Sequence, residues 1–276
     1  MGVWRMGWLL LSLPAMLGAG GTPERTVTPD PGAERELVER INQSRERQGL
    51  PKLEWNRKLA EAARSHALTM ALRGQVTHRF PEEAGLRPRI ADYGLRFDFV
   101  GENVGRARDA ALVHEDFLLS PGHRENILQE KANAVGVGAV RVDDDLFVTE
   151  DFAHVVPDYD PEQVEEMVIR RVEELRQQAG QPALERGALG PLREDACAMA
   201  QRDSVNGGLK AAPWLRGVVH TVAYSTADPQ RVPDQLRDEI LRERPLSFNV
   251  GACSAHSPGY PAGAYWVVVV FYFPLK

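Results

Sequence analysis

The chain has 276 residues, a length that suits one large domain or two domains of ordinary size. Hydrophobic residues make up 43% of it and charged residues 26%, which is typical of a globular protein that can bury a core. Its net charge of -6 comes without a basic stripe, and this argues against nucleic acid or an anionic membrane surface as a partner.

Residues 1–21 have the layout of a secretory signal peptide. Arg5 precedes an apolar run from Met6 to Ala19, and small residues follow up to a Gly-Gly pair where cleavage is expected. An uncleaved membrane anchor is the alternative, which Pro14 and the Gly-rich end disfavour. We therefore expect a secreted protein, extracellular or periplasmic, with no membrane span after cleavage.

Export would permit a disulfide, and the chain has 2 cysteines. Cys197 lies in a helical pattern and Cys253 in an expected strand, so only one pairing exists. Two buried free thiols are the alternative. Because a CxxC spacing is absent, neither cysteine is expected to bind metal or to act in redox chemistry.

The first half begins with helical periodicity. Asn56 and Asp109 stand where N-caps belong, and Gly49 and Gly94 stand where helices end. The expected helices run from Glu34 to Gly49, from Asn56 past Met70, from Arg87 to Tyr93, and from Asp109 to the Ser-Pro-Gly-His turn at residues 120–123.

A hairpin is expected after these helices. Its strands are AVGVGAVRV at residues 134–142 and LFVTEDFAHVV at residues 146–156, joined by a turn at residues 143–145. The GENVG segment, residues 101–105, is expected to be irregular. Helices followed by a hairpin predict an α+β fold with helices packed on an antiparallel sheet, rather than βαβ winding.

The second half starts at residues 157–161, where Asp160 can cap a new helix, and it repeats part of the first. RINQSRERQGLPKL aligns with RVEELRQQAGQPAL at an offset of 131 residues. The final AYWVVVVFYF reads as a buried strand. Either the domain is duplicated, or two amphipathic helices are alike by chance. The matched residues are Arg45, Gly49, Pro51 and Leu53 with Arg176, Gly180, Pro182 and Leu184.

Three residues of the first half carry the chemistry that a site needs. His78 lies in THRF, Glu102 in GENVG and His123 in SPGHRENIL. Imidazole and carboxylate groups bind divalent metals and transfer protons near neutral pH. The gaps of 24 and 21 residues are too long for a local ligand motif, so spacing alone also allows three ordinary polar residues.

Better-known catalytic motifs are absent from the sequence. His114 and Glu115 begin like the HExxH motif of zinc proteases, but Leu118 breaks it. The chain has no GxSxG elbow, no P-loop and no GxGxxG followed by a suitable acid. His66 lies on or beside the apolar stripe of its helix, and we interpret it as a structural histidine.

Taken together, INQSR, LAEAA, GENV, SPGHRENIL, VGVG and FVTEDF resemble the bacterial form of the CAP superfamily, also described as cysteine-rich secretory, antigen 5 and pathogenesis-related 1 or SCP-like proteins. The resemblance covers residues 33–156. It implies an α-β-α sandwich with a central antiparallel sheet, and an exported protein. Residues 160–276 resemble the same domain only weakly. They imply a degenerate second copy with a structural role, because GEN and SPGH have no counterparts there.

In this family two histidines and two acidic residues line a cavity that can hold a divalent metal, often zinc. By position, the resemblance implies His78, Glu102 and His123. Ser120 stands where the second Glu would be, so Glu115 would have to replace it from a rotated helix, with His114 as a weaker candidate. Three ligands would still suit zinc with an open water position.

Three functions remain open from the sequence. We favour a non-enzymatic secreted binding module for an unknown extracellular ligand, such as a lipid or a cell-surface component, as the resemblance implies. The second is a metal-dependent hydrolase or protease, with a metal-bound water and Glu102 or Glu115 as the base. The third is an exported protein whose polar cluster only braces the fold.

Overall fold

The structure is a computed structural model that describes residues 26–187, 192–206, 218–242 and 245–273. The expected signal peptide, residues 1–21, lies outside these ranges. No helix within the described ranges combines the length and the apolar character needed to cross a bilayer.

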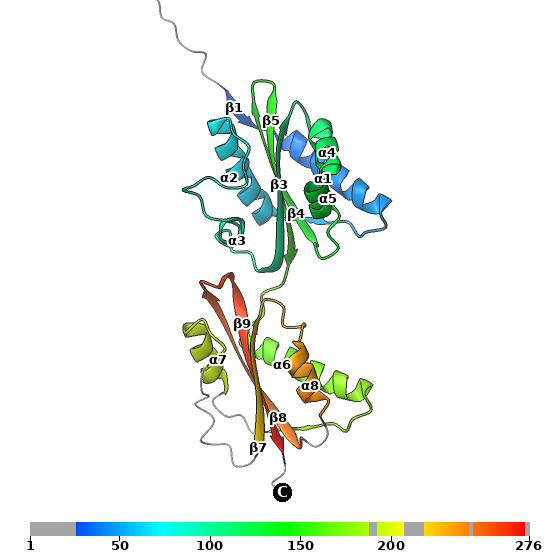
Figure 1. Cartoon of the computed structure of the whole chain (residues 1–276), viewed down its shortest axis with the longest axis vertical. Coiled ribbons are helices and arrows are strands. Elements are labelled where there is room, and N and C mark those ends of the chain that lie inside the picture. The colour runs from blue at the N-terminus through cyan, green and yellow to red at the C-terminus, as the bar shows by residue number, and fades with distance from the viewer. Residues whose placement is uncertain (1–25, 188–191, 207–217, 243–244, 274–276) are drawn as a thin grey trace, which may run out of the picture.

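One antiparallel sheet forms the centre of the first half (Figure 1). Its strands follow the order β1-β4-β5-β3, and the short β2 pairs parallel with β4. The hairpin of β4 and β5 falls where the sequence predicts it. The strands are β1 (Val27–Pro29), β2 (Glu54–Trp55), β3 (Phe97–Ala107), β4 (Ala134–Val142) and β5 (Asp145–Val155).

Helices cover both faces of this sheet. Figure 1 shows α2 and α3 on one side and α1, α4 and α5 on the other. The α-β-α arrangement with an antiparallel sheet confirms the predicted fold class. The helices are α1 (Pro31–Arg47), α2 (Arg57–Arg73), α3 (Leu86–Ala91), α4 (Ala110–Leu119) and α5 (Pro121–Ile127).

Local signals explain where these helices begin and how they pack. The Asn56 side chain accepts hydrogen bonds from the first turn of α2, and Asp109 accepts one from Leu112 N in α4, as the sequence predicts. Leu37 and Ile41 of α1 are fully buried in the core against the sheet. Amphipathic periodicity therefore places the helices, and capping fixes where they start.

The expectation that GENVG is irregular is wrong, because residues 101–105 lie within β3 and pair continuously with β5. The glycines here serve close packing instead of a turn. A Cβ on Gly101 would lie 2.7 Å from Asn126 Oδ1, and one on Gly105 would lie 2.7 Å from the Phe117 ring. Glycine is required because α4 and α5 approach β3 so closely.

The second half has a similar arrangement. Its sheet has the order β6-β8-β9-β7, with β6 parallel to β8. Figure 1 shows α7 on one face and α6 and α8 on the other. A disulfide joins Cys197 in α7 to Cys253 in β8. The elements are α6 (Pro161–Gln178), β6 (Glu185–Arg186), α7 (Leu192–Gln201), β7 (Val218–Thr226), α8 (Asp234–Ile240), β8 (Ser247–Ser257) and β9 (Tyr260–Phe273).

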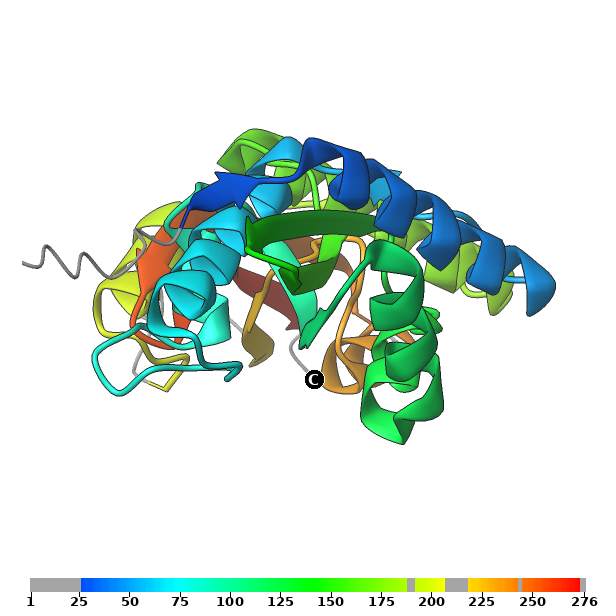
Figure 2. The same ribbon diagram turned by 90° about the horizontal axis from the view of Figure 1, so that it is seen from above.

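Two buried arginines make equivalent hydrogen bonds to backbone carbonyl oxygens in the two halves. Arg45 Nε donates to Pro51 O at 2.9 Å, and its Nη1 donates to Ile127 O at 2.9 Å. Arg176 Nε donates to Pro182 O at 2.8 Å, and its Nη1 donates to Ile240 O at 2.6 Å. Each guanidinium thus ties the first long helix of its half to the last turn of a short helix beside the sheet. Figure 2 shows α1 and α6 on the same side of the molecule.

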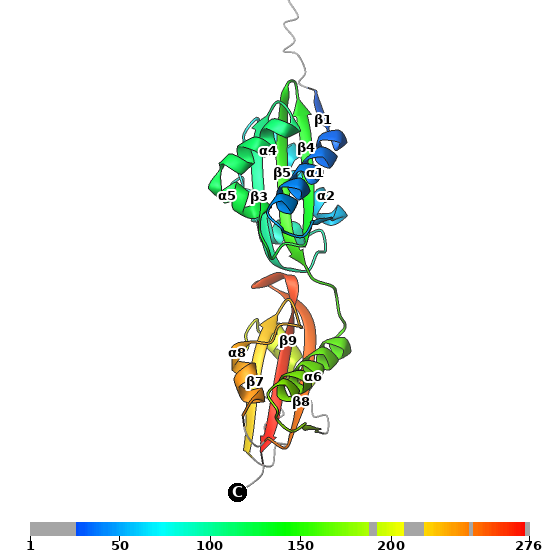
Figure 3. The same cartoon turned by 90° about the vertical axis from the view of Figure 1, so that its right-hand side faces the viewer.

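The two halves meet end to end (Figure 3). Arg96 of the first half contacts residues of the linker and of the second half. Its guanidinium pairs with Asp158 at 2.7 Å, donates to Ser254 Oγ at 3.1 Å and lies 4.4 Å from the centre of the Tyr265 ring. Ala262 of β9 also packs into the core beneath α2 and α3. The junction is therefore a packed contact as well as a covalent linker.

We expect Gly136→Ala to destabilise the first half strongly. A Cβ there would lie 2.2 Å from the backbone nitrogen of Ala60, so α2 would have to move off the sheet. The expected loss is about 3 kcal/mol or more in the free energy of unfolding, measured by urea denaturation. Gly122→Ala is the control, because nothing lies within 4 Å of its Cβ. Equal stability of the two variants would contradict this packing.

Candidate functional site

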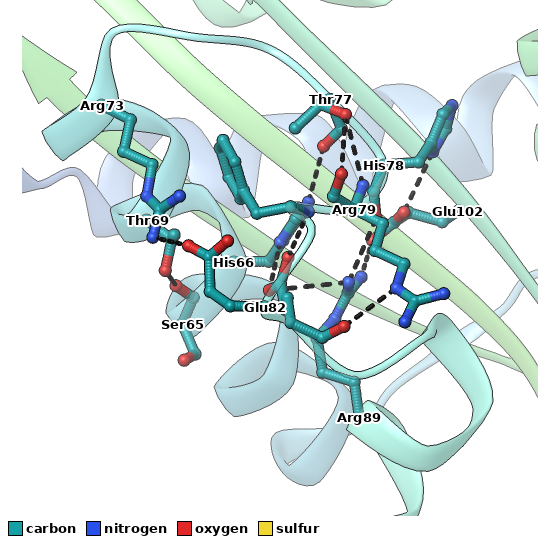
Figure 4. Close-up of polar contacts among 12 residues, drawn as sticks. Ser65, His66, Thr69, Arg73, Thr77, His78, Arg79, Glu82, Arg89 and Glu102 are labelled. Atoms are coloured by element: carbon teal, nitrogen blue, oxygen red, sulfur yellow. Dashed lines mark hydrogen bonds and ion pairs between the residues drawn. The ribbon is translucent and has the colours of Figure 1, made fainter.

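Glu102 is the centre of the candidate site and projects from β3 toward α3 (Figure 4). Its side chain is buried, and both of its carboxylate oxygens have partners. Oε1 lies 3.0 Å from His78 Nδ1, and Oε2 accepts a hydrogen bond from an Arg89 guanidinium nitrogen. The carboxylate therefore bridges an exposed histidine and a buried arginine.

The loop between α2 and α3 carries His78 and is anchored by a second set of contacts. His66 Nδ1 lies 2.7 Å from Glu83 Oε1, and its Nε2 lies 2.8 Å from Thr77 O. Arg89 donates to His78 O at 3.3 Å and lies 3.7 Å from Glu83. His66 is fully buried and acts as a brace for this loop, in agreement with its interpretation as structural. The loop thus holds His78 over Glu102.

On the other face of β3, amides position His123. Asn103 Nδ2 donates to His123 O at 3.1 Å, and Asn126 Nδ2 donates to Glu102 O at 3.0 Å. The His123 ring packs edge-on against Phe117, with 4.8 Å between ring centres. The turn at the start of α5 therefore presents His123 at the edge of the sheet.

The structure brings His78, Glu102 and His123 together. The ring centres of the two histidines lie 6.4 Å apart, and 59% of the His78 side chain is exposed. The hydrogen bond to Glu102 raises the pKa of His78 above its usual value. Burial and then the neighbouring His78 lower the pKa of His123. The surroundings thus shift the pKa values of the two imidazoles in opposite directions.

The weaker candidates lie outside this cluster or contribute little to it. His114 is buried between α4 and α1, where its Nε2 lies 2.8 Å from Ser44 Oγ. Burial lowers the pKa of His114 to about 4, so it remains neutral at physiological pH. Glu115 is exposed on α4. Ser120 forms the junction of α4 and α5, and its side chain makes no capping hydrogen bond.

Sequence reasoning missed two buried acids on β5. Asp151 is in register with Glu102, and both Asp151 oxygens are buried without a hydrogen-bond partner. Burial, followed by the charge of Glu102, raises the pKa of Asp151 well above its usual value. Glu150 faces the opposite side and accepts a hydrogen bond from Asn103 at 3.0 Å. The available signal was two consecutive acids within the strand expected at residues 146–156.

As placed, these side chains do not form a ligand set for a divalent metal. The Arg89 guanidinium stands against the Glu102 oxygen that a metal would need. Among the residues that the structure describes, no group of three or more His, Cys, Asp or Glu side chains has the geometry to hold a metal ion. Glu102 and His78 instead form a hydrogen bond with each other.

The first half is thus a layered α-β-α domain with two histidines and a buried glutamate beside its edge strand β3. Residues 38–156 match the family described as CAP, the Cysteine-rich secretory protein family.

Two curated relatives and a solved structure have detectable similarity. The uncharacterized protein YkwD of Bacillus subtilis is 29% identical over 39% of this chain and 42% of its own. The uncharacterized membrane protein YlbC of the same species is 30% identical over 40% of this chain and 32% of its own. An extracellular protein containing a SCP domain from Bacillus anthracis is 29% identical, with a TM-score of 0.41 over 44% of this chain and 40% of its own. This chain spans less than half the length of these relatives.

Glu150→Gln should change how stability depends on pH. Burial raises the pKa of Glu150 from 4.5 to about 8, so the folded protein holds this proton to higher pH than the unfolded chain does. The stability from this group is full below pH 4.5 and is lost as the pH rises toward 8. The variant, which keeps an oxygen for Asn103, is expected to gain on the order of 3 kcal/mol over wild type at about pH 7.

The measurement is urea denaturation at several pH values. The exposed Glu115→Gln, which also removes one carboxylate, is the control and should follow wild type throughout. A gain from Glu150→Gln that is the same at about pH 5 and about pH 8 would contradict a neutral Glu150.

Proposed function

We propose that this chain is an exported, non-enzymatic binding protein that contacts its ligand through the surface around His78 and His123. The observation that carries the proposal is the double engagement of Glu102 by His78 and Arg89. A general base needs a free oxygen within reach of a water molecule. A carboxylate with both oxygens engaged, and paired with a buried guanidinium, serves to hold the site in shape.

A hydrolase has less support from the same residues. The exposed Glu115 makes no described contact with the cluster, and His114 is engaged with Ser44 inside the helix layer. Ser44 and His114 are only 5% and 3% exposed, so a substrate would not reach this Ser-His pair.

The surface beside His123 suits an amphipathic ligand, and a lipid is the class we propose. A groove of about 440 Å³ runs along α4 and α5, the segment that carries His123. Leu119 in this groove is 83% exposed, which is unusual for a large apolar side chain without a partner. The groove residues are Leu118, Leu119, Pro121, Arg124, Glu125 and Leu128. Apolar walls with charged groups beside them match an acyl chain with a polar head.

Export is supported by the disulfide between Cys197 and Cys253, since such bonds persist in oxidising compartments. The signal-peptide layout of residues 1–21 is independent support from the sequence.

We also propose that the second half arose as a copy of the first and has lost the site. Gly136 in β4 packs on Leu59 of α2, and Gly251 in β8 packs on Leu192 of α7 in the same way. Counting along the strand registers from these glycines aligns the two sheets. On this alignment Glu102, Asn103, Glu150 and Asp151 correspond to Ala223, Tyr224, Val267 and Val268. The polar centre of the first half is replaced by apolar and aromatic side chains, which supports a structural role.

Leu119→Asp should weaken the binding of a fluorescent fatty acid about tenfold or more, because a charge would be placed in the apolar wall of the groove. The measurement is a fluorescence titration of the purified protein. Leu72→Asp is the matched control, since Leu72 is 66% exposed on α2, across the sheet from the groove. Equal affinities of the two variants, or no binding by wild type, would exclude this groove as the lipid site.

The enzymatic alternative has its own test. Wild type and a His78→Ala/His123→Ala variant are expected to show the same background rate on casein and on a nitrophenyl ester, with zinc added. Hydrolysis by wild type that is absent from the double variant would contradict the non-enzymatic proposal and support a hydrolase.

A further inference from the structure

We propose that the guanidinium of Arg89 is the resident cation of this site and stands where a divalent metal would otherwise bind, so that the cluster keeps its shape without metal. The inference concerns how the site is held together and does not depend on the ligand proposed above.

Arg89 lies where three separate segments of the first half meet. It comes from α3, and Figure 4 shows its side chain directed toward Glu102. Its side chain is 8% exposed, and its nitrogens contact the Glu102 carboxylate and the backbone oxygen of His78. A single side chain thus joins β3, α3 and the loop that carries His78, which is how a metal ion connects separate segments.

The buried charges around Arg89 also disfavour a bound metal ion. Glu102 and Asp151 lie in register on adjacent strands, and both are buried. Arg89 supplies one permanent positive charge, which compensates one carboxylate. Asp151 is fully buried and has no hydrogen-bond partner on either oxygen, so Arg89 is the cation that faces this pair of acids. A divalent ion beside this guanidinium would meet strong repulsion in a buried setting.

Without Arg89, the remaining side chains of the cluster would be available as metal ligands. His78, Glu102 and Asp151 would then present one imidazole and two carboxylates, with His123 beside them. Two buried carboxylates without a cation must either take up a proton or bind a metal. This donor set suits zinc. With Arg89 present, its guanidinium occupies the place of a metal ion. Without Arg89, the same side chains would be able to bind a metal.

The test is calorimetric titration of zinc into the purified, folded proteins. Wild type and Arg89→Lys, which keeps the positive charge, are expected to bind no zinc at this site. Arg89→Gln is expected to bind one zinc ion per chain. Adding Glu102→Gln to that variant should then weaken zinc binding on the order of ten- to a hundredfold, because a ligand is lost.

Chelation provides a second readout on wild type. EDTA is expected to leave the melting temperature of wild type unchanged, because no metal supports its fold. One zinc per wild-type chain that His78→Ala abolishes would overturn the proposal. A folded Arg89→Gln that binds no zinc would overturn it equally. Should Arg89→Gln fail to fold, the wild-type titration and its EDTA control decide alone. Fatty-acid binding is measured separately, so failure of either proposal can be recognised.

Discussion

The buried guanidinium of Arg45 is the contact on which the architecture of the first half depends. It is fully buried in α1 and donates to the carbonyl oxygens of Pro51, Ile127 and Gln129. These bonds fix the loop before β2 and the end of α5, two segments far apart in the chain. Because α5 also carries His123 and Asn126, the arginine that holds the helix layer also places one side of the candidate site. Removing it would leave several buried carbonyls without a donor.

Arg176 repeats this arrangement in the second half. The same arginine bonds, the same parallel pairing of a short strand and the same glycine contact with a helix recur there. Where β3 and β5 carry acids and amides, the matching strands carry residues such as Val267 and Val268. The scaffold therefore does not require the polar cluster. Glu150 and Asp151 are costly to bury, and a sheet of this kind folds without them, so a role outside stability best accounts for their presence in β5.

Local features were predictable from the sequence because their causes are local. The caps at Asn56, Asp109 and Asp160, and the hairpin of β4 and β5, depend on residues within a few positions of each other. The GENVG segment was mispredicted because glycine permits both a turn and a close approach, and only the positions of Phe117 and Asn126 decide between them. The family resemblance located His78, Glu102 and His123, which spacing alone would not have done.

Arg89 shows why the rest of the site escaped prediction. In the sequence it is one of several arginines near a short helix, and nothing local separates it from its exposed neighbour Arg87. Its role arises only when α3 folds over β3 and places its charge against a carboxylate 13 residues away in the chain. A motif of histidines and a glutamate therefore predicts where a cluster forms, whereas the charge that closes the cluster is a tertiary property. The same motif in two chains can then mark a metal site in one and a self-compensated ion pair in the other, depending on a residue outside it.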